Sequence, residues 1–418
     1  MSQHKASILP QKHGKLEVDT RPTPVPQGTQ ALVKVTAASI NPIDWKIIDY
    51  GLFIDKFPAV LGTDGAGIIE AVGPDVTHFK PGDKVFFQGI YTRVDETTFQ
   101  QKTIVETDII SKIPDNIDED QASTIPVATL AALVGLFQKT GVDVPINGPT
   151  VNGRGVLVLG GSSSVGQFAI QLARITGFSP IVTTASAQHT DFLKSIGATH
   201  IFDRNVDAKT IQSAFATPVS LVLDAVSVES TQSLAYEVLT TPSPVPGAHL
   251  SIARPLVDAV KEKNVDNRVT INYFFGSSHM HRDLSIPFWQ SVGQWIKDGK
   301  LVPNRVQVVK GGLAALPEAL DLSRKGARGA LAPDISLDQQ ITMEPGYFAY
   351  RYKRKYYRQY LQYDASPYDS GHGRRLANTV PRDPSALKDW VADRITMVEN
   401  AKICEMKGRG LRFCDKLR

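Results

Sequence analysis

One run of small and apolar residues has the spacing needed to hold a phosphate group. The run Val156-Leu-Val-Leu-Gly-Gly-Ser-Ser-Ser-Val-Gly166 leads from an apolar stretch into a helix-compatible segment, Gln167–Thr176. A strand must end and a helix begin here, and the first backbone N–H groups of a helix can bind an anion. We expect this loop to bind a dinucleotide pyrophosphate; a Gly/Ser turn of another α/β fold is the alternative. The loop residues are Gly161, Ser162, Ser163, Ser164, Val165 and Gly166.

The loop fits the pattern G-x-G-x-x-G with one departure. Its three glycine positions are occupied by Gly161, Ser163 and Gly166, so that serine replaces the middle glycine. We expect Gly161 to permit the tight turn and Gly166 to allow close packing of the helix on the strand. The position of the loop between a strand and a helix is the context that supports a dinucleotide site.

The residues after the next apolar segment bear on which dinucleotide binds. NAD sites place an Asp or Glu at the end of this strand to bind the ribose 2′-hydroxyl. Here no acidic residue follows, and the four residues in that place are Ser186, Ala187, Gln188 and His189. Ser186 and His189 can donate to a 2′-phosphate, and Arg204 could add a charge-assisted contact. The sequence therefore favours NADPH, although plain surface polar residues would look the same.

Potential metal ligands are sparse. The two cysteines, Cys404 and Cys414, both lie in the last fifteen residues, which excludes a structural four-cysteine zinc site. His279 and His281 are two residues apart in an expected loop, where we interpret them as polar surface residues. The sequence therefore predicts no metal site. The low cysteine content also predicts a reducing, cytoplasmic location.

Two patterns of secondary structure surround these residues. Residues 1–124 contain short strand-like runs closed by Gly, Pro and Asp, which indicates a small barrel or sandwich. Residues 125–270 alternate strands with helices, which indicates a doubly wound parallel sheet and so an α/β fold. The expected strands are 31–40, 68–72, 84–87, 156–159, 180–183, 200–202, 221–223 and 250–252. The expected helices are 128–137, 167–176, 190–196, 288–297 and 318–325.

Charge and composition exclude some partners. The chain has a net charge of +4, but residues 336–418 hold 16 Lys+Arg against 10 Asp+Glu, so the rest is nearly neutral. We therefore expect no nucleic-acid partner. No apolar run is long enough for a membrane span, and residues 1–15 lack the apolar stretch of a signal peptide. We expect the basic, tyrosine-rich segment 336–418 to be an appendage that is poorly ordered or packed on the surface.

Three further segments carry a resemblance to a known family. They are Ala38–Lys46, Phe57–Gly67 and Val72–Val85, and together with the phosphate loop they resemble the medium-chain dehydrogenase/reductase superfamily from about residue 5 to residue 329. The motifs are most similar to those of its zinc-independent branch, which holds quinone oxidoreductases and fungal trans-acting enoyl reductases of polyketide biosynthesis. Zinc members place Cys near position 41 and a His-Glu pair at 63–64, where this chain has Asn41, Thr63 and Asp64.

The resemblance implies the domain organisation. It predicts a GroES-like β-rich catalytic domain whose N-terminal part is 1–124, and a Rossmann NADP-binding domain at 125–270. The chain would return to the catalytic domain over 271–335 and end in an atypical tail at 336–418. Relatives close the catalytic domain with a final strand of the type Ser-Gly-x-Lys-Leu-Val. Ala330–Asp334 departs from this pattern, and Pro333 is poorly suited to a central strand, so we expect that strand to be lost.

The resemblance also implies roles for individual residues. Lys46 is the candidate catalytic residue, hydrogen-bonding a substrate carbonyl or the nicotinamide ribose and stabilising an enolate; the alternative is a solvated lysine. Asp44 would orient it, and Ala253 with Arg254 would reach the nicotinamide. The residues expected to touch the cofactor or line the cleft here are Ile43, Asp44, Trp45 and Lys46. The residues expected to face an acyl substrate, which suit a core helix equally well, are Ala128, Thr129, Leu130, Ala131, Ala132, Leu133, Val134 and Gly135.

These implications lead to one functional hypothesis. It is an NADPH-dependent oxidoreductase that transfers hydride to an activated alkene, acting as a trans-acting enoyl reductase in fungal secondary metabolism. The substrate would be a small molecule or a carrier-bound acyl group, with a polyketide synthase as a candidate partner. A quinone oxidoreductase and a catalytically weak cofactor-binding protein are the alternatives.

Overall fold

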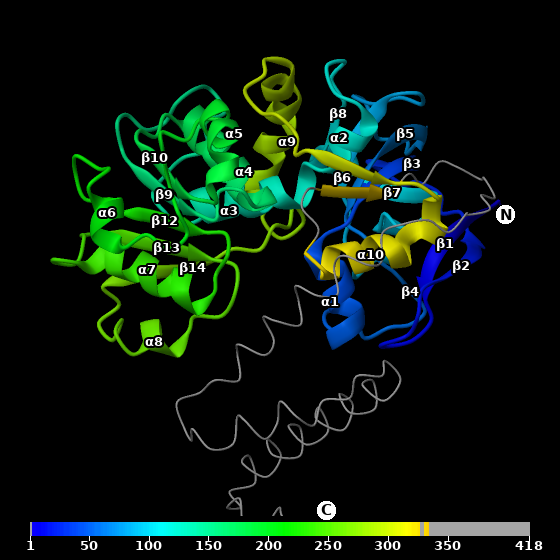
Figure 1. Ribbon diagram of the computed structural model, residues 1–418. Helices are drawn as coiled ribbons and strands as arrows, with labels where there is room; N and C mark the ends of the chain where they lie inside the picture. The colour runs from blue at the N-terminus through cyan, green and yellow to red at the C-terminus, as the bar shows by residue number, and fades with distance from the viewer. Residues whose placement is uncertain (1, 327–329, 334–418) are drawn as a thin grey trace, which may run out of the picture. The chain divides into compact units, whose positions relative to one another are not determined.

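A computed structural model describes residues 2–326 and 330–333. The N-terminal region is β-rich, as expected. Five strands form an antiparallel sheet in the order β7-β3-β5-β6-β8, and three more form the sheet β2-β1-β4 (Figure 1). Its elements are β1 (Gln3–Leu9), β2 (Glu17–Pro22), β3 (Gln30–Ser39), α1 (Pro42–Tyr50), β4 (Ala59–Val60), β5 (Asp64–Val72), β6 (Lys84–Gln88), η1 (Val94–Glu96), β7 (Lys102–Glu106), η2 (Thr107–Ile109), β8 (Ile110–Lys112) and α2 (Glu119–Ser123).

The middle of the chain forms a six-stranded parallel sheet in the order β11-β10-β9-β12-β13-β14. The strand order reverses between β9 and β12, and such switch points are where doubly wound folds bind nucleotides. Its strands are β9 (Val156–Leu159), β10 (Ile181–Thr184), β11 (His200–Phe202), β12 (Leu221–Asp224), β13 (Ala248–Ile252) and β14 (Val269–Tyr273). Its helices are α3 (Pro126–Phe137), α4 (Ser164–Thr176), η3 (Ala187–His189), α5 (Thr190–Ser195), α6 (Ala208–Gln212), α7 (Glu229–Thr240) and α8 (Asp258–Lys261).

Both faces of this sheet are covered, because side chains alternate along each strand. Val156 and Val158 of β9 belong to the core shared with α3 and α4, whereas Leu157 and Leu159 belong to the core shared with α6 and α7. Figure 1 shows these helix groups on opposite faces of the sheet. A strand buried on both faces reads as a continuous apolar run, which is why the sequence identified β9 so clearly.

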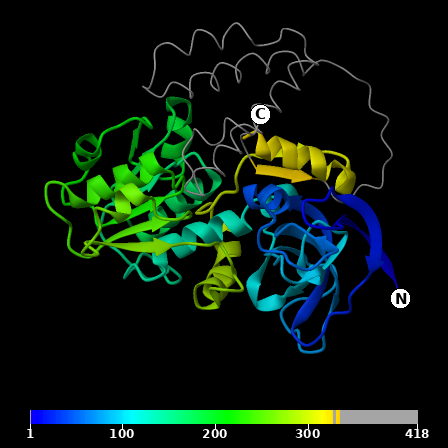
Figure 2. The same ribbon diagram turned by 90° about the horizontal axis from the view of Figure 1, so that it is seen from below.

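After β14 the chain returns to the β-rich region. Helix α9 (Arg282–Lys297) contacts α3 and β8, and helix α10 (Leu316–Arg324) lies beside α1. Figures 1 and 2 both show α10 (yellow) next to α1 (blue), although more than 260 residues separate them in sequence. The remaining elements are β15 (Val306–Val309), η4 (Gly312–Ala315) and β16 (Ala330–Pro333).

Two expectations about this returning segment need correction. The closing strand is present: β16 pairs in parallel with β15, and Pro333 is its last residue, opposite Val309. A proline is tolerated there because β16 belongs to a two-stranded sheet and has no second partner strand in it. The predicted boundary at residue 270 cuts through β14, so that residues 271–273 belong to the parallel sheet. The predicted tail, 336–418, lies outside the described residues.

Helix content was underestimated in both domains. The sequence predicted α3, α4, α5, α9 and α10, with boundaries that differ by a few residues, but it did not identify α1, α2, α6, α7 or α8. No helix in the described part of the chain is both long and apolar enough to cross a membrane.

Candidate dinucleotide and substrate site

The phosphate loop connects β9 to α4 as predicted. Ser163 is the N-cap of α4, and its hydroxyl accepts a hydrogen bond from the Gly166 N–H at 3.1 Å and donates one to the Gly160 carbonyl at 2.8 Å. Serine is a favoured N-cap residue because its oxygen satisfies an N–H of the first helical turn. The serine at the middle position of the motif therefore stabilises the start of the helix that a bound phosphate would face.

The tight turn is made by a different glycine from the one predicted, whereas Gly166 allows the close packing expected of it. Gly160, which the sequence did not single out, has the left-handed φ of +80° that the turn needs, whereas Gly161 does not. A Cβ on Gly161 would lie 2.1 Å from the Thr183 Oγ1, and one on Gly166 would lie 2.3 Å from the Gly160 carbonyl oxygen. Gly161 and Gly166 thus let the loop lie close against β10 and against itself. The cradle fits the backbone approach that a pyrophosphate requires.

The predicted 2′-phosphate residues follow two neighbouring strands. Ser186 comes two residues after β10, and Arg204 comes two residues after β11; the two strands pair with Thr184 opposite Phe202. Ser186 is half-buried and Arg204 is exposed, so both are open to a ligand at this edge. The nearby Asp203 is at the end of β11, not β10, and its carboxylate accepts a hydrogen bond from the Asn205 N–H at 3.0 Å.

Lys46 and Arg254 are brought together from opposite halves of the molecule. Lys46 lies on α1, and Arg254 follows β13 at the edge of the parallel sheet. Partial burial lowers the pKa of the Lys46 ammonium, and the positive charge of Arg254 lowers it further. Lys46 also lies over the Trp45 ring, with 5.4 Å between its Nζ and the ring centroid. Two cations from the two domains that feel each other's charge suit a bound anion or a developing negative charge.

Asp44 has a different task from the one expected. Its carboxylate is fully buried and accepts a hydrogen bond from the Asn41 N–H at 2.7 Å, so it caps the first turn of α1. No contact between Asp44 and Lys46 is found in the described structure, and Asp44 does not face outward to a cofactor as Ile43 and Trp45 can. Burial raises the pKa of Asp44 well above its usual range.

At the positions where zinc members carry their ligands, Asn41 and Asp64 are joined by a hydrogen bond, and Thr63 pairs with Tyr91. The Asn41 amide donates to Asp64 at 3.0 Å, and the Thr63 and Tyr91 hydroxyl oxygens lie 3.4 Å apart. Burial raises the pKa of Asp64 to about 7, although hydrogen bonds from Asn41 and the Val127 N–H oppose the shift.

Asp64 also connects β5 to α3. Its second oxygen accepts from the Val127 N–H at 2.8 Å, in the first turn of α3, where Ile125 at the N-cap has no side chain able to do so. A carboxylate at a helix N-terminus is favoured by the helix dipole as well. The sequence had marked position 64 only as a missing zinc ligand. No local signal predicts this cap, because Asp64 and Val127 lie far apart in the sequence.

The predicted acyl-facing segment is part of the core. All eight residues from Ala128 to Gly135 are buried, and α3 contacts α4, α9 and β12. A Cβ on Gly135 would lie 2.8 Å from the Leu223 Cδ1, so this glycine allows close packing of α3 on β12. Of the two interpretations that the sequence left open, the structure favours the core helix.

One cluster of possible metal ligands lies elsewhere. Glu96, Glu106 and His279 offer ligand atoms within 4.8 Å of one another. Arg93 pairs with both carboxylates at 2.8 and 3.0 Å, and Arg282 pairs with Glu106 at 2.7 Å, so these cations already compensate the acids. The His279 side chain is only 7% exposed, which corrects the expectation of a surface histidine. Burial lowers its pKa to about 4.

Comparisons with known proteins agree with this architecture. Residues 27–115 match the family described as "Alcohol dehydrogenase GroES-like domain", and residues 164–242 match "Zinc-binding dehydrogenase". "Dehydrogenase azaJ" of Aspergillus niger is 31% identical over 338 residues, which are 77% of this chain and 95% of the relative. "Trans-enoyl reductase tndF" of Aspergillus flavipes is 31% identical over 346 residues, which are 78% of this chain and 97% of the relative.

Solved structures show the same fold. A quinone oxidoreductase from Coxiella burnetii has a TM-score of 0.62 at 25% identity, covering 80% of this chain and 99% of its own. A putative zinc-dependent alcohol dehydrogenase from Rhizobium etli has a TM-score of 0.67 at 25% identity, covering 80% of this chain and 98% of its own. The chain belongs to the medium-chain dehydrogenase/reductase family, whose members are oxidoreductases. This family and the Rossmann sheet indicate a nicotinamide cofactor.

Proposed function

We propose that the chain is an NADPH-dependent enoyl reductase that works without a catalytic zinc. The hydrogen bond between Asn41 and Asp64 carries this proposal, because it occupies the positions where zinc members hold their metal. Without a Lewis acid, hydride addition to an activated alkene is easier than the oxidation of a simple alcohol. Relatives that are called trans-enoyl reductases, such as that of Aspergillus flavipes, support the same reaction.

The residues present fit a nicotinamide dinucleotide. The glycines of the phosphate loop leave room for a pyrophosphate, and the N-terminus of α4 faces it. When bound, the cofactor would supply the hydride, and the protein would supply position and charge. Lys46 would donate a hydrogen bond to the substrate carbonyl or to the ribose, and the nearby Arg254 would strengthen the positive field.

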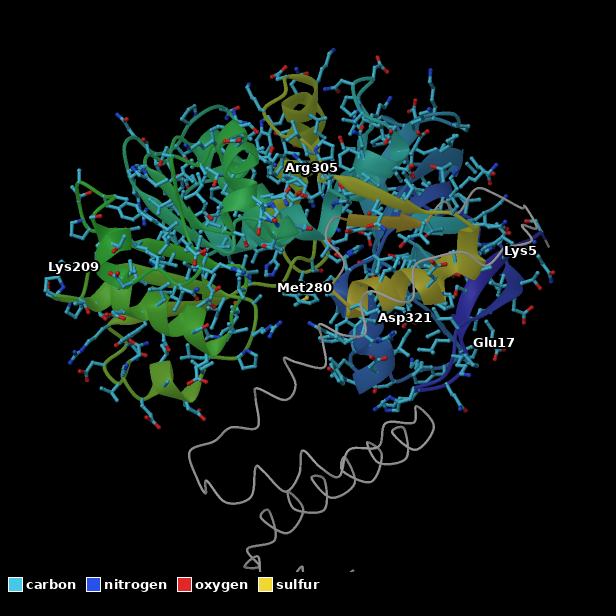
Figure 3. The ribbon with its side chains drawn as sticks, in the orientation of Figure 1. Lys5, Glu17, Lys209, Met280, Arg305 and Asp321 are labelled. Carbon is cyan, nitrogen blue, oxygen red and sulfur yellow. The ribbon has the colours of Figure 1, made fainter. Side chains whose placement is uncertain are left out.

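Preference for NADPH rests on the residues after β10 and β11. No acid follows β10, and Arg204 is an exposed cation near Ser186. We expect Arg204→Ala to lower kcat/KM for NADPH about tenfold or more and to leave NADH turnover nearly unchanged, since a charge-assisted bond contributes about 1.5–3 kcal/mol. The control is Lys209→Ala, an exposed cation on α6 labelled in Figure 3. An equal loss with both cofactors would contradict this assignment.

The role of Lys46 is tested by its replacement. Lys46→Met keeps the length of the side chain but removes the donor, and we expect kcat to fall about a hundredfold, the size seen when one stabilising donor is lost. Lys56→Met, a change to an exposed lysine in the loop after α1, is the matched control. Unchanged kcat in Lys46→Met would show that Lys46 is a solvated lysine.

The reaction class is decided by a substrate panel. NADPH oxidation should be measured with 2-enoyl thioesters and with quinones, before and after dialysis against a chelator. We expect enoyl turnover that the chelator leaves unchanged. Quinone turnover without enoyl turnover would favour a quinone oxidoreductase, and tight NADPH binding with no turnover would favour a catalytically weak protein. In the proposed setting the acyl group arrives on a carrier, and a polyketide synthase is the proposed partner, which binding measurements with such a synthase would test.

A further inference from the structure

Exposed aromatic side chains gather in two short segments. Across residues 2–326, the exposed Phe, Tyr and Trp residues are Tyr50 and Phe53, at and after the end of α1, and Tyr273 and Phe275, at and after the end of β14. Met280, labelled in Figure 3 on the loop between β14 and α9, is also exposed. Isolated exposed apolar residues need no explanation, but a group contributed by two separate segments marks a binding surface.

The two segments meet through one aromatic pair. The rings of Phe53 and Phe275 lie 6.1 Å apart between centroids at an angle of 41°, and the two side chains are 58% and 44% exposed. Such contacts between rings are favourable, yet large parts of both faces stay in contact with water. A pair of rings that is formed but not covered is ready to receive a further apolar group.

Both sides of the pair are held in place. Phe53 has a left-handed φ of +62°, which is strained for a residue with a side chain and persists only where the surroundings hold it. On the other side, the buried Gln88 donates to the Gly276 carbonyl at 2.5 Å and accepts from the Ser278 N–H at 2.6 Å. Gly276 lies so close to α3 that a Cβ would be 2.5 Å from the Val127 carbonyl oxygen. The pair is therefore preorganised.

The elements that lead to the pair lie beside the residues assigned to the reacting end. Tyr50 ends the helix that carries Lys46, four residues earlier, which is about 6 Å along the helix axis. Tyr273 of β14 is opposite Ile252, the last residue of β13, and Arg254 comes two residues after Ile252. A substrate held at Lys46 and Arg254 can thus extend towards Phe53 and Phe275.

We propose that Phe53 and Phe275 form an aromatic clamp for the apolar chain of the acyl substrate, which makes the enzyme select long chains over short ones. This inference rests on the proposed enoyl reductase function. An acyl chain suits the clamp better than a protein, because two half-exposed rings offer far less than the roughly 800 Å² per partner of a stable protein interface. The clamp determines which acyl chain lengths bind well, and it takes no part in hydride transfer.

The test is a series of 2-enoyl thioesters from four to twelve carbons. In the wild-type protein we expect kcat/KM to rise up to about fourfold for each methylene group that the clamp buries. In Phe53→Ala and Phe275→Ala this rise should flatten, while the value for the four-carbon substrate stays within about twofold. Phe275→Leu should keep part of the rise, and Val265→Ser, at an exposed apolar residue after α8, should keep all of it. Circular dichroism checks that each variant is folded.

The outcomes separate the clamp from the proposed function. A wild-type kcat/KM that does not change with chain length, or an equal loss at every length in the variants, would overturn the clamp. So would a dimer that dissociates in Phe275→Ala, because the rings would then serve self-association. If the folded wild-type protein reduces no enoyl thioester, the proposed function fails. Binding of saturated acyl thioesters then tests the clamp alone: weaker binding of long chains in Phe275→Ala supports it, and unchanged binding rejects it.

Discussion

Replacement of Gly161 by alanine should both destabilise the protein and weaken cofactor binding. The added Cβ would lie 2.1 Å from the Thr183 Oγ1, on a fully buried side chain that donates to the Val158 carbonyl at 2.7 Å. Overpacking of a well-filled site typically costs about 1–3 kcal/mol, and we expect the upper part of this range because the blocking atom is held by its own hydrogen bond. NADPH binding should weaken as the loop is displaced.

The origin of this cost can be tested by a double-mutant cycle. Thr183→Ala alone should cost about 1 kcal/mol through the lost hydrogen bond. In the double variant the nearest atoms would be the residue-183 Cβ and the Ile170 Cδ1, both at 3.1 Å, which a small shift accommodates. We therefore expect the double variant to be more stable than the sum of the single changes predicts, by at least about 1 kcal/mol.

The assay is urea unfolding followed by circular dichroism, with the slopes compared so that a change in midpoint reports stability. Gly299→Ala is the matched control: its glycine has a φ of +67° and nothing within 4 Å of the added Cβ, so it introduces backbone strain without a contact. Thr183→Ala should not rescue it. The reasoning is wrong if Gly161→Ala is neutral, or if its cost simply adds to that of Thr183→Ala.

Two further predictions concern side chains that fix the starts of helices. Ser163→Ala should lower the free energy of unfolding by about 1 kcal/mol, because the N-cap of α4 is lost. Ser163→Gly, which restores the middle glycine of the motif, should lower it by only a few tenths of a kcal/mol. Equal losses in the two variants would contradict the cap. For Asp64 the folded state favours the protonated acid, because its pKa is raised from 3.8 to about 7, so its contribution to stability should fall as the pH rises from 4 to 7. Asp64→Asn cannot ionise, and the stability difference between it and the wild type should change across this range by an amount of the order of 4 kcal/mol; a difference independent of pH would refute the shift.

The structure explains why some predictions from sequence were reliable. Strand β9 and the loop to α4 are encoded locally, because a short apolar run, two glycines and a serine fix a strand, a turn and a helix start within eleven residues. The cap formed by Ser163 is equally local. In contrast, the sequence analysis assigned the tight turn to Gly161, whereas Gly160 has the left-handed φ that the turn needs. The role of Gly161 is to leave space for Thr183, which is 22 residues away on a neighbouring strand, and this space cannot be read from the local sequence.

Residues whose partners are distant in sequence were misjudged. His279 was expected at the surface but is buried beside Glu96. Pro333 was expected to prevent a closing strand, yet it is compatible with the two-stranded sheet that β15 provides. In each case the missing information was the neighbour, which periodicity and propensity do not contain.

The sequence by itself determined the family, the phosphate loop and the absence of cysteine and histidine at the usual zinc-ligand positions, because these depend on residue types and short spacings. Only the tertiary structure decided that Asp64 joins β5 to α3, that Lys46 comes within the electrostatic influence of Arg254, and that Phe53 meets Phe275. These pairs come from segments separated by about 60 to more than 200 residues. Side chains so far apart in sequence meet only when the parallel sheet and the β-rich domain have packed, and that packing is a property of the whole chain.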